Sequence, residues 1–179
     1  MKRIAFFILA FLLIASPAYA GGIGSWFGGP TGGVVTPANS QKQVVSPAYP
    51  NSTSPYVMQG LAGLITPARS GNVLILISGT ITASNNTIAY GVQYQISYGT
   101  STAPTSNSAL AGTQVGTVQK YENQSSGITA ADVFIPFSTH AVVTGLTVGT
   151  AYWIDLAAES IGAVSDVGFS NVSITVIEQ

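Results

Sequence analysis

The chain has 179 residues, of which 46% are hydrophobic and only 6% are charged, and it contains no cysteine. The absence of cysteine excludes disulfides, thiol catalysis and a lipid anchor on an N-terminal cysteine. Lys and Arg are too few to neutralise a run of phosphates, which argues against nucleic acid as a partner. A surface so poor in charge repels copies of itself weakly and therefore favours association.

Residues 1–20 have the three parts of a secretory signal peptide. A basic start at Lys2 and Arg3 precedes a short apolar run, and the sequence AYA that ends at Ala20 has the small-x-small pattern of a cleavage site. We therefore predict cleavage before Gly21 and export to the periplasm, the cell surface or the medium. The alternative is an uncleaved anchor, but the apolar run is shorter than the roughly 20 residues that a membrane span needs.

Residues 21–55 are rich in Gly, Pro and Ser and show neither helical nor strand periodicity. This composition predicts a flexible leader. Trp26 and Phe27 are two large aromatic residues among its glycines, and two interpretations of them remain open. Either they pack loosely on the domain or lie exposed, or they dock onto a partner or a membrane surface.

After Pro55 the sequence changes to short runs with period-two alternation, which predict an all-β fold. We expect one domain, residues 56–179, built as a single antiparallel two-sheet β-sandwich of about eight strands. The apolar run 73–77 predicts a central strand covered on both faces, residues 83–87 predict a hairpin turn, and Pro136 predicts an edge strand or a bulge. The predicted strands are 56–58, 73–77, 90–98, 113–121, 133–137, 140–144, 151–158 and 172–177.

The strand that begins near Tyr152 has two chemically different faces. Tyr152, Ile154 and Leu156 share one face, and period two places Trp153 and Asp155 on the other. Trp is enriched at contact surfaces. Three interpretations of this second face remain open: a subunit interface or ligand patch, coverage by a loop or by the leader, and plain exposure.

The spacing L-x-x-G-T-x-Y, formed by Leu146, Gly149 and Tyr152, resembles the tyrosine corner of fibronectin type III and related immunoglobulin-like sandwiches. This resemblance implies that the Tyr152 side chain hydrogen-bonds back to upstream backbone and that Leu146 is a core residue. The chain departs from the family pattern in three places: the run 73–77 lacks the expected Trp, the corner lacks its usual proline at Val148, and the segment ADVFIPF is additional.

A second resemblance covers the same residues. The segments ITPARSGNVLILISGT, GLTVGTAYWIDL and FSNVSITVI are similar to the jelly-roll sandwiches of C1q and tumour necrosis factor type. This resemblance implies a jelly-roll topology and a homo-oligomer, most simply a trimer. Over its whole length the chain also resembles exported proteins of bacteria and phages that carry YGT-x-TAP and GLT-x-GT-x-YWIDLA segments, which implies a fold and a setting but no activity.

Groups that could carry catalysis are few. His140 stands alone beside an apolar strand, and without a Cys or a second His it completes neither a zinc site nor a thiol dyad. Asp155 and Glu159 could serve a glycosidase, but four residues along a strand span roughly 13 Å, and a solvated rim explains both. No calcium-loop motif occurs. We predict no catalytic residue, no metal site and no cofactor.

The sequence therefore favours an exported, non-catalytic structural or adhesive β-sandwich on a cell surface or a phage virion, working as a homo-oligomer. Its candidate binding or interface residues are Trp153, Asp155, Trp26 and Phe27. The alternative function is that of a secreted protein that binds or cleaves carbohydrate, with a cell-surface glycan as its ligand.

Overall fold

A computed structural model of the chain describes residues 36–47, 49–83, 90–123, 133–162 and 167–179. All the regular secondary structure in these residues is β-strand, which confirms the predicted all-β class. The strands are β1 (Asn39–Val44), β2 (Val57–Met58), β3 (Gly63–Ile65), β4 (Val73–Ala83), β5 (Tyr90–Gly99), β6 (Thr113–Asn123), β7 (Val133–Val143), β8 (Tyr152–Ile161) and β9 (Val167–Glu178).

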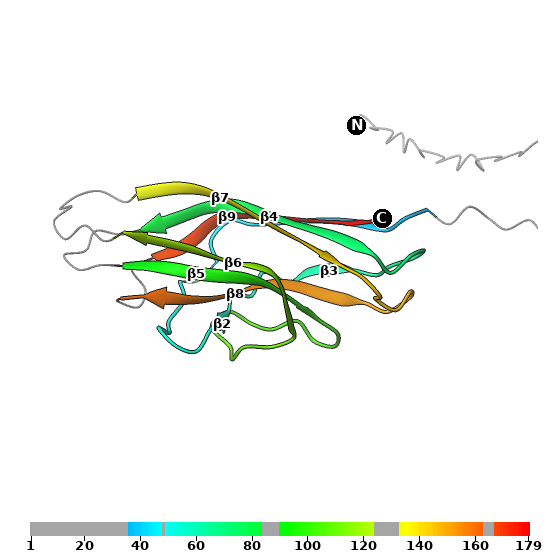
Figure 1. Cartoon of the computed structure of the whole chain (residues 1–179), viewed down its shortest axis with the longest axis horizontal. Helices are drawn as coiled ribbons and strands as arrows, with labels where there is room; N and C mark the ends of the chain where they lie inside the picture. The colour runs from blue at the N-terminus through cyan, green and yellow to red at the C-terminus, as the bar shows by residue number, and fades with distance from the viewer. Residues whose placement is uncertain (1–35, 48, 84–89, 124–132, 163–166) are drawn as a thin grey trace, which may run out of the picture. The chain divides into compact units, whose positions relative to one another are not determined.

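The strands form two antiparallel sheets that stack as layers (Figure 1). Sheet A has the order β1-β9-β4-β7. Sheet B has the order β2-β8-β5-β6, and β3 also pairs with β8. Because β2 and β3 pair with β8 at successive positions along the same edge, they act as one interrupted strand.

The pairing of strands is nested along the chain. The first strand β1 pairs with the last strand β9, the interrupted strand β2–β3 pairs with β8, β4 pairs with β7, and β5 pairs with β6. This nesting is the arrangement of a jelly roll. In an immunoglobulin-like sandwich the last two strands pair within one sheet, whereas β8 and β9 lie in different sheets here. The two-sheet sandwich is thus confirmed, with jelly-roll and not fibronectin topology.

The core lies between the two sheets and contains three aromatic rings in mutual contact. Tyr94 of β5 meets Phe137 of β7 and Phe169 of β9 edge to face, and the ring centroids are 5.2 and 5.4 Å apart. These contacts join the two sheets, because β5 belongs to sheet B and the other two strands to sheet A. Each such pair adds about 0.5–1.5 kcal/mol beyond the burial of the rings.

Strand β4 is central in sheet A, as predicted, but it is not covered on both faces. Ile75 and Ile77 point into the core and are at most 1% exposed, whereas Leu76 between them is 36% exposed. An apolar run alone does not distinguish a strand buried on both sides from one that leaves apolar side chains on an open face.

Two other strand predictions need correction. Residues 83–87 do not connect a hairpin of neighbouring strands, because β4 belongs to sheet A and β5 to sheet B; residues 84–89 themselves lie outside the described residues. The runs predicted at 133–137 and 140–144 form the single strand β7. β7 is an edge strand of sheet A, which confirms the edge placement of Pro136.

The boundary between leader and domain, predicted at residue 55, also needs correction. Strand β1, Asn39–Val44, lies within the predicted leader and pairs with β9 over its whole length. A polar segment with no apolar periodicity can still form an edge strand, because its ladder consists of backbone hydrogen bonds. Residues 1–35, which hold the predicted signal peptide, Trp26 and Phe27, lie outside the described residues.

Candidate functional site

Part of the outer face of sheet B, around Trp153, is covered by the chain itself, whereas Leu64 of β3 on the same face is 58% exposed. Residues 100–112, which connect β5 to β6 and which we call the covering loop, lie over this face and are tied to β2. The Met58 amide donates to the Ser108 carbonyl at 3.0 Å, and the Asn107 amide donates to the Met58 carbonyl at 2.7 Å. Beneath the loop a small buried cluster separate from the main core consists of Met58, Trp153 and Ala157.

The Trp153 indole occupies a slot between two glycines. A Cβ atom on Gly99 would lie 2.6 Å from the ring, and a Cβ atom on Gly112 would lie 2.4 Å from it. The indole Nε1 donates to the Thr100 carbonyl at 2.9 Å, and the side chain is 3% exposed. Period two therefore placed Trp153 on the outer face of sheet B, and of the three interpretations of that face the structure favours coverage by a loop, because the covering loop already buries the indole.

Asp155 is also buried, on the same face of β8, and it fills the interruption between β2 and β3. Its carboxylate accepts hydrogen bonds from the amides of Gly60 and Leu61, both at 2.9 Å, and from the amide of Leu156 at 2.8 Å. Burial raises the pKa of Asp155 to about 6, although these three amides and the charge of Lys42 act in the opposite direction. Asp155 is thus a structural carboxylate within the covered part of this face, and the solvated rim predicted for it is wrong.

The two carboxylates considered for glycoside hydrolysis have separate partners. Asp155 is held by backbone amides, as above, while Glu159 accepts a hydrogen bond from the Gln93 side-chain amide. A pair of carboxyl groups that shares one substrate needs both groups free to face it. The structure does not bring these two together as such a pair.

The tyrosine corner forms as the sequence predicted. Tyr152 is the first residue of β8, and its hydroxyl oxygen accepts a hydrogen bond from the Thr147 amide at 3.0 Å. Leu146 belongs to the core, and its amide donates to the Gly71 carbonyl. Gly149 has a φ of +81°, a backbone conformation that favours glycine. The corner contact therefore occurs on a jelly-roll sandwich as well.

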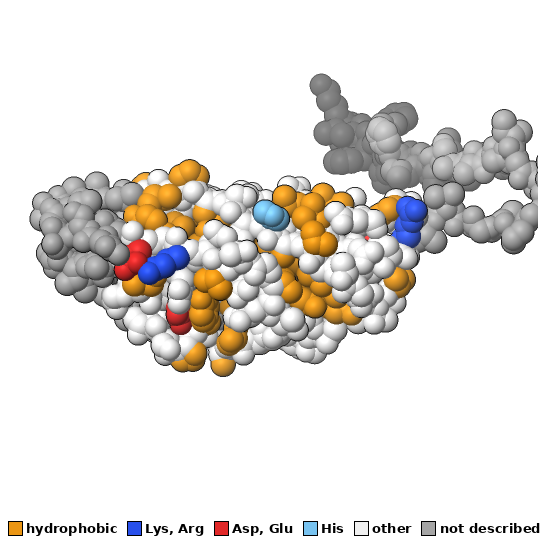
Figure 2. Space-filling view, in the orientation of Figure 1, with side chains coloured by type: hydrophobic (Ala, Val, Ile, Leu, Met, Phe, Trp, Pro, Cys, Tyr) orange, Lys and Arg blue, Asp and Glu red, His pale blue; other side chains and the backbone are white. Residues whose placement is uncertain are grey.

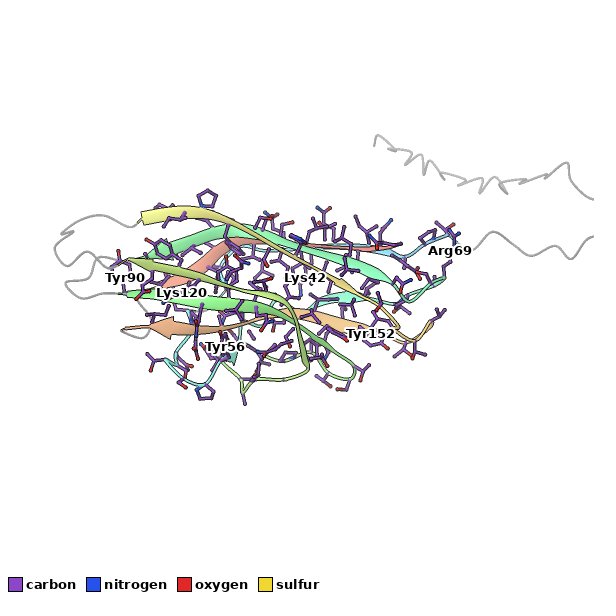
Figure 3. The ribbon with its side chains drawn as sticks, viewed as in Figure 1. Lys42, Tyr56, Arg69, Tyr90, Lys120 and Tyr152 are labelled. Atoms are coloured by element: carbon purple, nitrogen blue, oxygen red, sulfur yellow. The ribbon has the colours of Figure 1, made fainter. Side chains whose placement is uncertain are left out.

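Sequence reasoning missed Glu178, the last residue of β9. Its carboxylate is 3% exposed and accepts hydrogen bonds from the amides of Ala38, Ala68, Arg69 and Ser70 at 2.6 to 2.9 Å. Removal from water opposes its ionisation, but these amides outweigh that effect and lower the pKa of Glu178 to about 2. Figure 3 shows Arg69 in the loop at this end of the sandwich, opposite the end that bears Tyr90. No sequence motif marks this contact, because its donors are backbone groups.

The outer face of sheet A differs from that of sheet B because no described segment lies over its central rows. Strand register places Ile177, Leu74 and Val142 side by side in one row and Thr175, Leu76 and His140 in the next. We call Leu74, Leu76, Val142 and Ile177 the bare face. Leu76, Val142 and Ile177 are 36%, 55% and 41% exposed. The β1 neighbours in these rows, Asn39 and Gln41, are uncharged, so no Lys, Arg, Asp or Glu interrupts either row.

Charged side chains are sparse elsewhere as well. Figure 2 shows only a few Lys, Arg, Asp and Glu side chains on one side of the molecule, among separate groups of hydrophobic ones. Within the described part of the chain an ion pair joins Lys120 and Glu122. Because charge is depleted in the centre of protein interfaces, an uncharged apolar face is the strongest candidate for a contact surface in the described residues.

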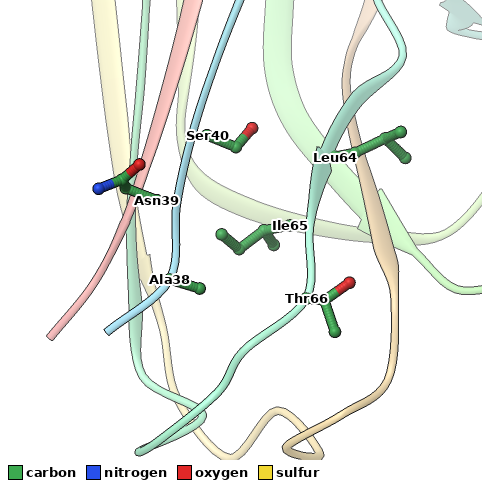
Figure 4. Close-up of a pocket in the computed structure, with 6 residues that line it drawn as sticks. All are labelled: Ala38, Asn39, Ser40, Leu64, Ile65 and Thr66. Atoms are coloured by element: carbon green, nitrogen blue, oxygen red, sulfur yellow. The ribbon is translucent and has the colours of Figure 1, made fainter. Parts of the chain in front are cut away.

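Two open grooves run along the edges where the sheets meet. One, of about 340 Å³, lies between β1 and β3 and is lined by Ser40, Leu64, Ile65 and neighbouring residues (Figure 4). The other, of about 530 Å³, lies between the edge strands β6 and β7 and is lined partly by Thr117, Ser138 and His140. Among the described residues that line these grooves there is no Asp, Glu, Lys or Cys.

The described residues contain no group of three or more His, Cys, Asp and Glu that could hold a metal ion. In the same residues we find no helix long and apolar enough to cross a membrane.

Comparison with known proteins adds a likeness in structure. No family model matches the chain, and no curated protein matches its sequence. Among solved structures the chain is similar to Eiger TNF from S. frugiperda, with 8% identity and a TM-score of 0.39 over 80% of this chain and 94% of that chain.

Proposed function

We propose that this protein is an exported, non-catalytic structural or adhesive module that works on a cell surface or a phage virion as a homo-oligomer. The observation that carries the proposal is the bare face of sheet A, an uncharged apolar surface in the central strands of a rigid sandwich. The fold is compatible with such a role, because double-sheet jelly rolls occur in viral capsid and lectin domains.

A second copy of the chain is the partner that fits the bare face best. The face carries no charge that an unlike partner would have to match, and apolar groups of one copy can meet the same groups of another in an isologous contact. The low charge of the whole chain adds little repulsion between copies. An isologous contact closes as a dimer, whereas the trimer that the jelly-roll resemblance implies needs heterologous contacts around a three-fold axis, and the molar mass distinguishes the two.

The experiment measures the molar mass of the exported protein by size exclusion with light scattering. The full chain is expressed in a bacterial host, recovered from the exported fraction and sequenced from its N-terminus, which we expect at Gly21. The wild type should elute as more than one chain. Leu76→Lys should elute as a single chain, because it places a charge in the centre of the bare face.

The matched control is Gln114→Lys, which adds the same charge to an exposed position of edge strand β6 in sheet B. It should leave the molar mass of the wild-type assembly unchanged. A wild type that is a single chain at high micromolar concentration would refute the homo-oligomer. Retention of the whole chain inside the cell would refute the exported setting.

A further inference from the structure

Strand β1 is held to the sandwich mainly through its backbone. Its sequence is NSQKQV, and most of its side chains are exposed. Only Val44, with Ala38 just before the strand, packs against the main core, and both are partly buried. Apolar burial therefore contributes little to holding β1 in place, since each buried CH₂ group is worth only about 0.8 kcal/mol.

The site that β1 occupies is, by contrast, built to receive a strand. Beside β1 in the same sheet lie Val172, Ile174 and Val176 of β9, core residues that are at most 1% exposed. The backbone of β9 on this side needs a partner along the whole ladder. If β1 left, both an apolar edge and a row of unpaired amide and carbonyl groups would face water, which is the situation that promotes pairing with another chain.

Polar contacts at one end and in the middle of the site fix the register of the strand. At one end Glu178 holds both backbone groups of Ala38: the Ala38 amide donates to Glu178 Oε2 at 2.7 Å, and the Glu178 amide donates to the Ala38 carbonyl at 2.9 Å. In the middle, Lys42 Nζ crosses the edge of the sandwich and donates to the Ala62 carbonyl at 3.0 Å. The groove of Figure 4 runs along the same strand.

The strand β1 thus buries little apolar surface of its own, whereas its departure would expose the backbone edge of β9 to water. A segment that refills the site must match the backbone length and register of β1 and supply the lysine that contacts Ala62. A second copy of this chain supplies that segment. We propose that β1 is an exchangeable strand, and that the edge formed by β9, Glu178 and Ala62 binds the β1 segment of a second copy. Exchange re-forms every contact of β1 and is a low-cost route to linked subunits.

The chain after β1 sets the reach of such an exchange. Val45 is still tied to β9, because its carbonyl accepts a hydrogen bond from the Asn171 amide at 2.8 Å, and the chain is fixed again at Tyr49, whose ring covers Gly168 and whose hydroxyl contacts Thr82. A few extended residues span only roughly 3.3–3.6 Å each. The two copies must therefore lie with their β1 edges side by side. This contact differs from the one proposed for the bare face.

The experiment uses the absence of cysteine in the natural chain. Gln43 and Ser173 are register partners across β1 and β9. A Gln43→Cys chain and a tagged Ser173→Cys chain are mixed, unfolded, refolded together over a range of micromolar concentrations and gently oxidised. Exchange brings the two cysteines together in different chains, so non-reducing electrophoresis should show a mixed dimer whose yield rises with concentration, several-fold above either chain alone.

The control pair is Ser78→Cys with Ser138→Cys, register partners of β4 and β7 that lie in the same row of the same face. Association through the bare face would raise the yield of the mixed dimer for both pairs alike, whereas exchange raises that yield only for the pair that spans β1 and β9. The far-UV spectrum of each refolded mixture must match that of the wild type. Equal yields from the two pairs at every concentration would overturn the exchange while leaving the proposed association through the bare face intact.

Discussion

The two outer faces of this sandwich are built from similar strands, but a loop covers the centre of one face and no described segment covers the centre of the other. On sheet B the chain lays its own covering loop over Trp153, which becomes part of a second core. On sheet A the bare face keeps Leu76 and Val142 in contact with water. The difference shows that an aromatic side chain on the outer side of a strand is weak evidence of a binding surface when a neighbouring loop is long enough to bury it. The uncovered aliphatic residues are the better candidates.

The largest expected effect is at Trp153. Trp153→Ala should destabilise the folded chain by about 3–5 kcal/mol, because it removes a fully covered indole and leaves a cavity under the covering loop. Denaturant unfolding followed by circular dichroism measures this loss. If the variant instead keeps its stability and only changes its molar mass, the indole lies in a subunit interface and the comparison between the two faces fails.

Substitution of a glycine beside the indole also tests whether the covering loop packs against Trp153. Gly112→Ala combines a φ of +76° with a Cβ atom 2.3 Å from the Tyr98 carbonyl oxygen, and should cost about 2–4 kcal/mol. Gly149→Ala is the matched control: its φ is +81°, but nothing lies within 4 Å of the added Cβ. The control should cost only about 1 kcal/mol. Equal losses in the two variants would mean that the loop does not press on the indole.

Asp155 makes the unfolding free energy of the chain depend on pH. Its pKa rises from 3.8 in the unfolded chain to about 6 in the folded one, so its contribution to stability is complete below 3.8 and is lost as pH rises through 6. Between pH 4.5 and 7, Asp155→Asn should therefore gain about 2 kcal/mol relative to the wild type. Denaturant unfolding at several pH values measures this gain.

Glu159→Gln, four residues further along β8, controls for the loss of a carboxylate from the same strand. Glu178 does not interfere in this window, because its pKa falls from 4.5 to about 2 and its own contribution is lost only as pH falls below 4.5. If the difference in unfolding free energy between Asp155→Asn and the wild type stays constant from pH 4.5 to 7, the raised pKa of the buried Asp155 carboxyl group is contradicted.

The sequence predicted what depends on local period and turn chemistry. Alternation along β8 separated Tyr152 from Trp153, and the spacing of Leu146, Gly149 and Tyr152 predicted the corner hydrogen bond. Both inferences succeed because the geometry of one strand and one turn is determined within about ten residues.

Contacts between distant segments could not be predicted in the same way. The burial of Trp153 depends on Gly112, some forty positions away in the chain, and Asp155 is held by amides that carry no residue signature. Strand β1 shows no apolar period because its partner is the backbone of β9. In each case the deciding groups are backbone atoms or glycines, which sequence patterns of side chains do not represent.

The smallest expected effect is on the bare face. Leu76→Ala should change the unfolding free energy of the single chain by less than about 0.5 kcal/mol, because Leu76 lies on the surface and its removal leaves no cavity. Association alters this result in a definite direction, since a partner that binds only the folded chain adds stability in proportion to the logarithm of its concentration. The melting temperature of the wild type should therefore rise with protein concentration, and that of Leu76→Ala should rise less. Thermal melts at low and high micromolar concentration test both statements. A melting temperature of the wild type that does not depend on concentration would refute self-association through the bare face. A large loss of unfolding free energy in dilute Leu76→Ala would show that this face is covered within the single chain.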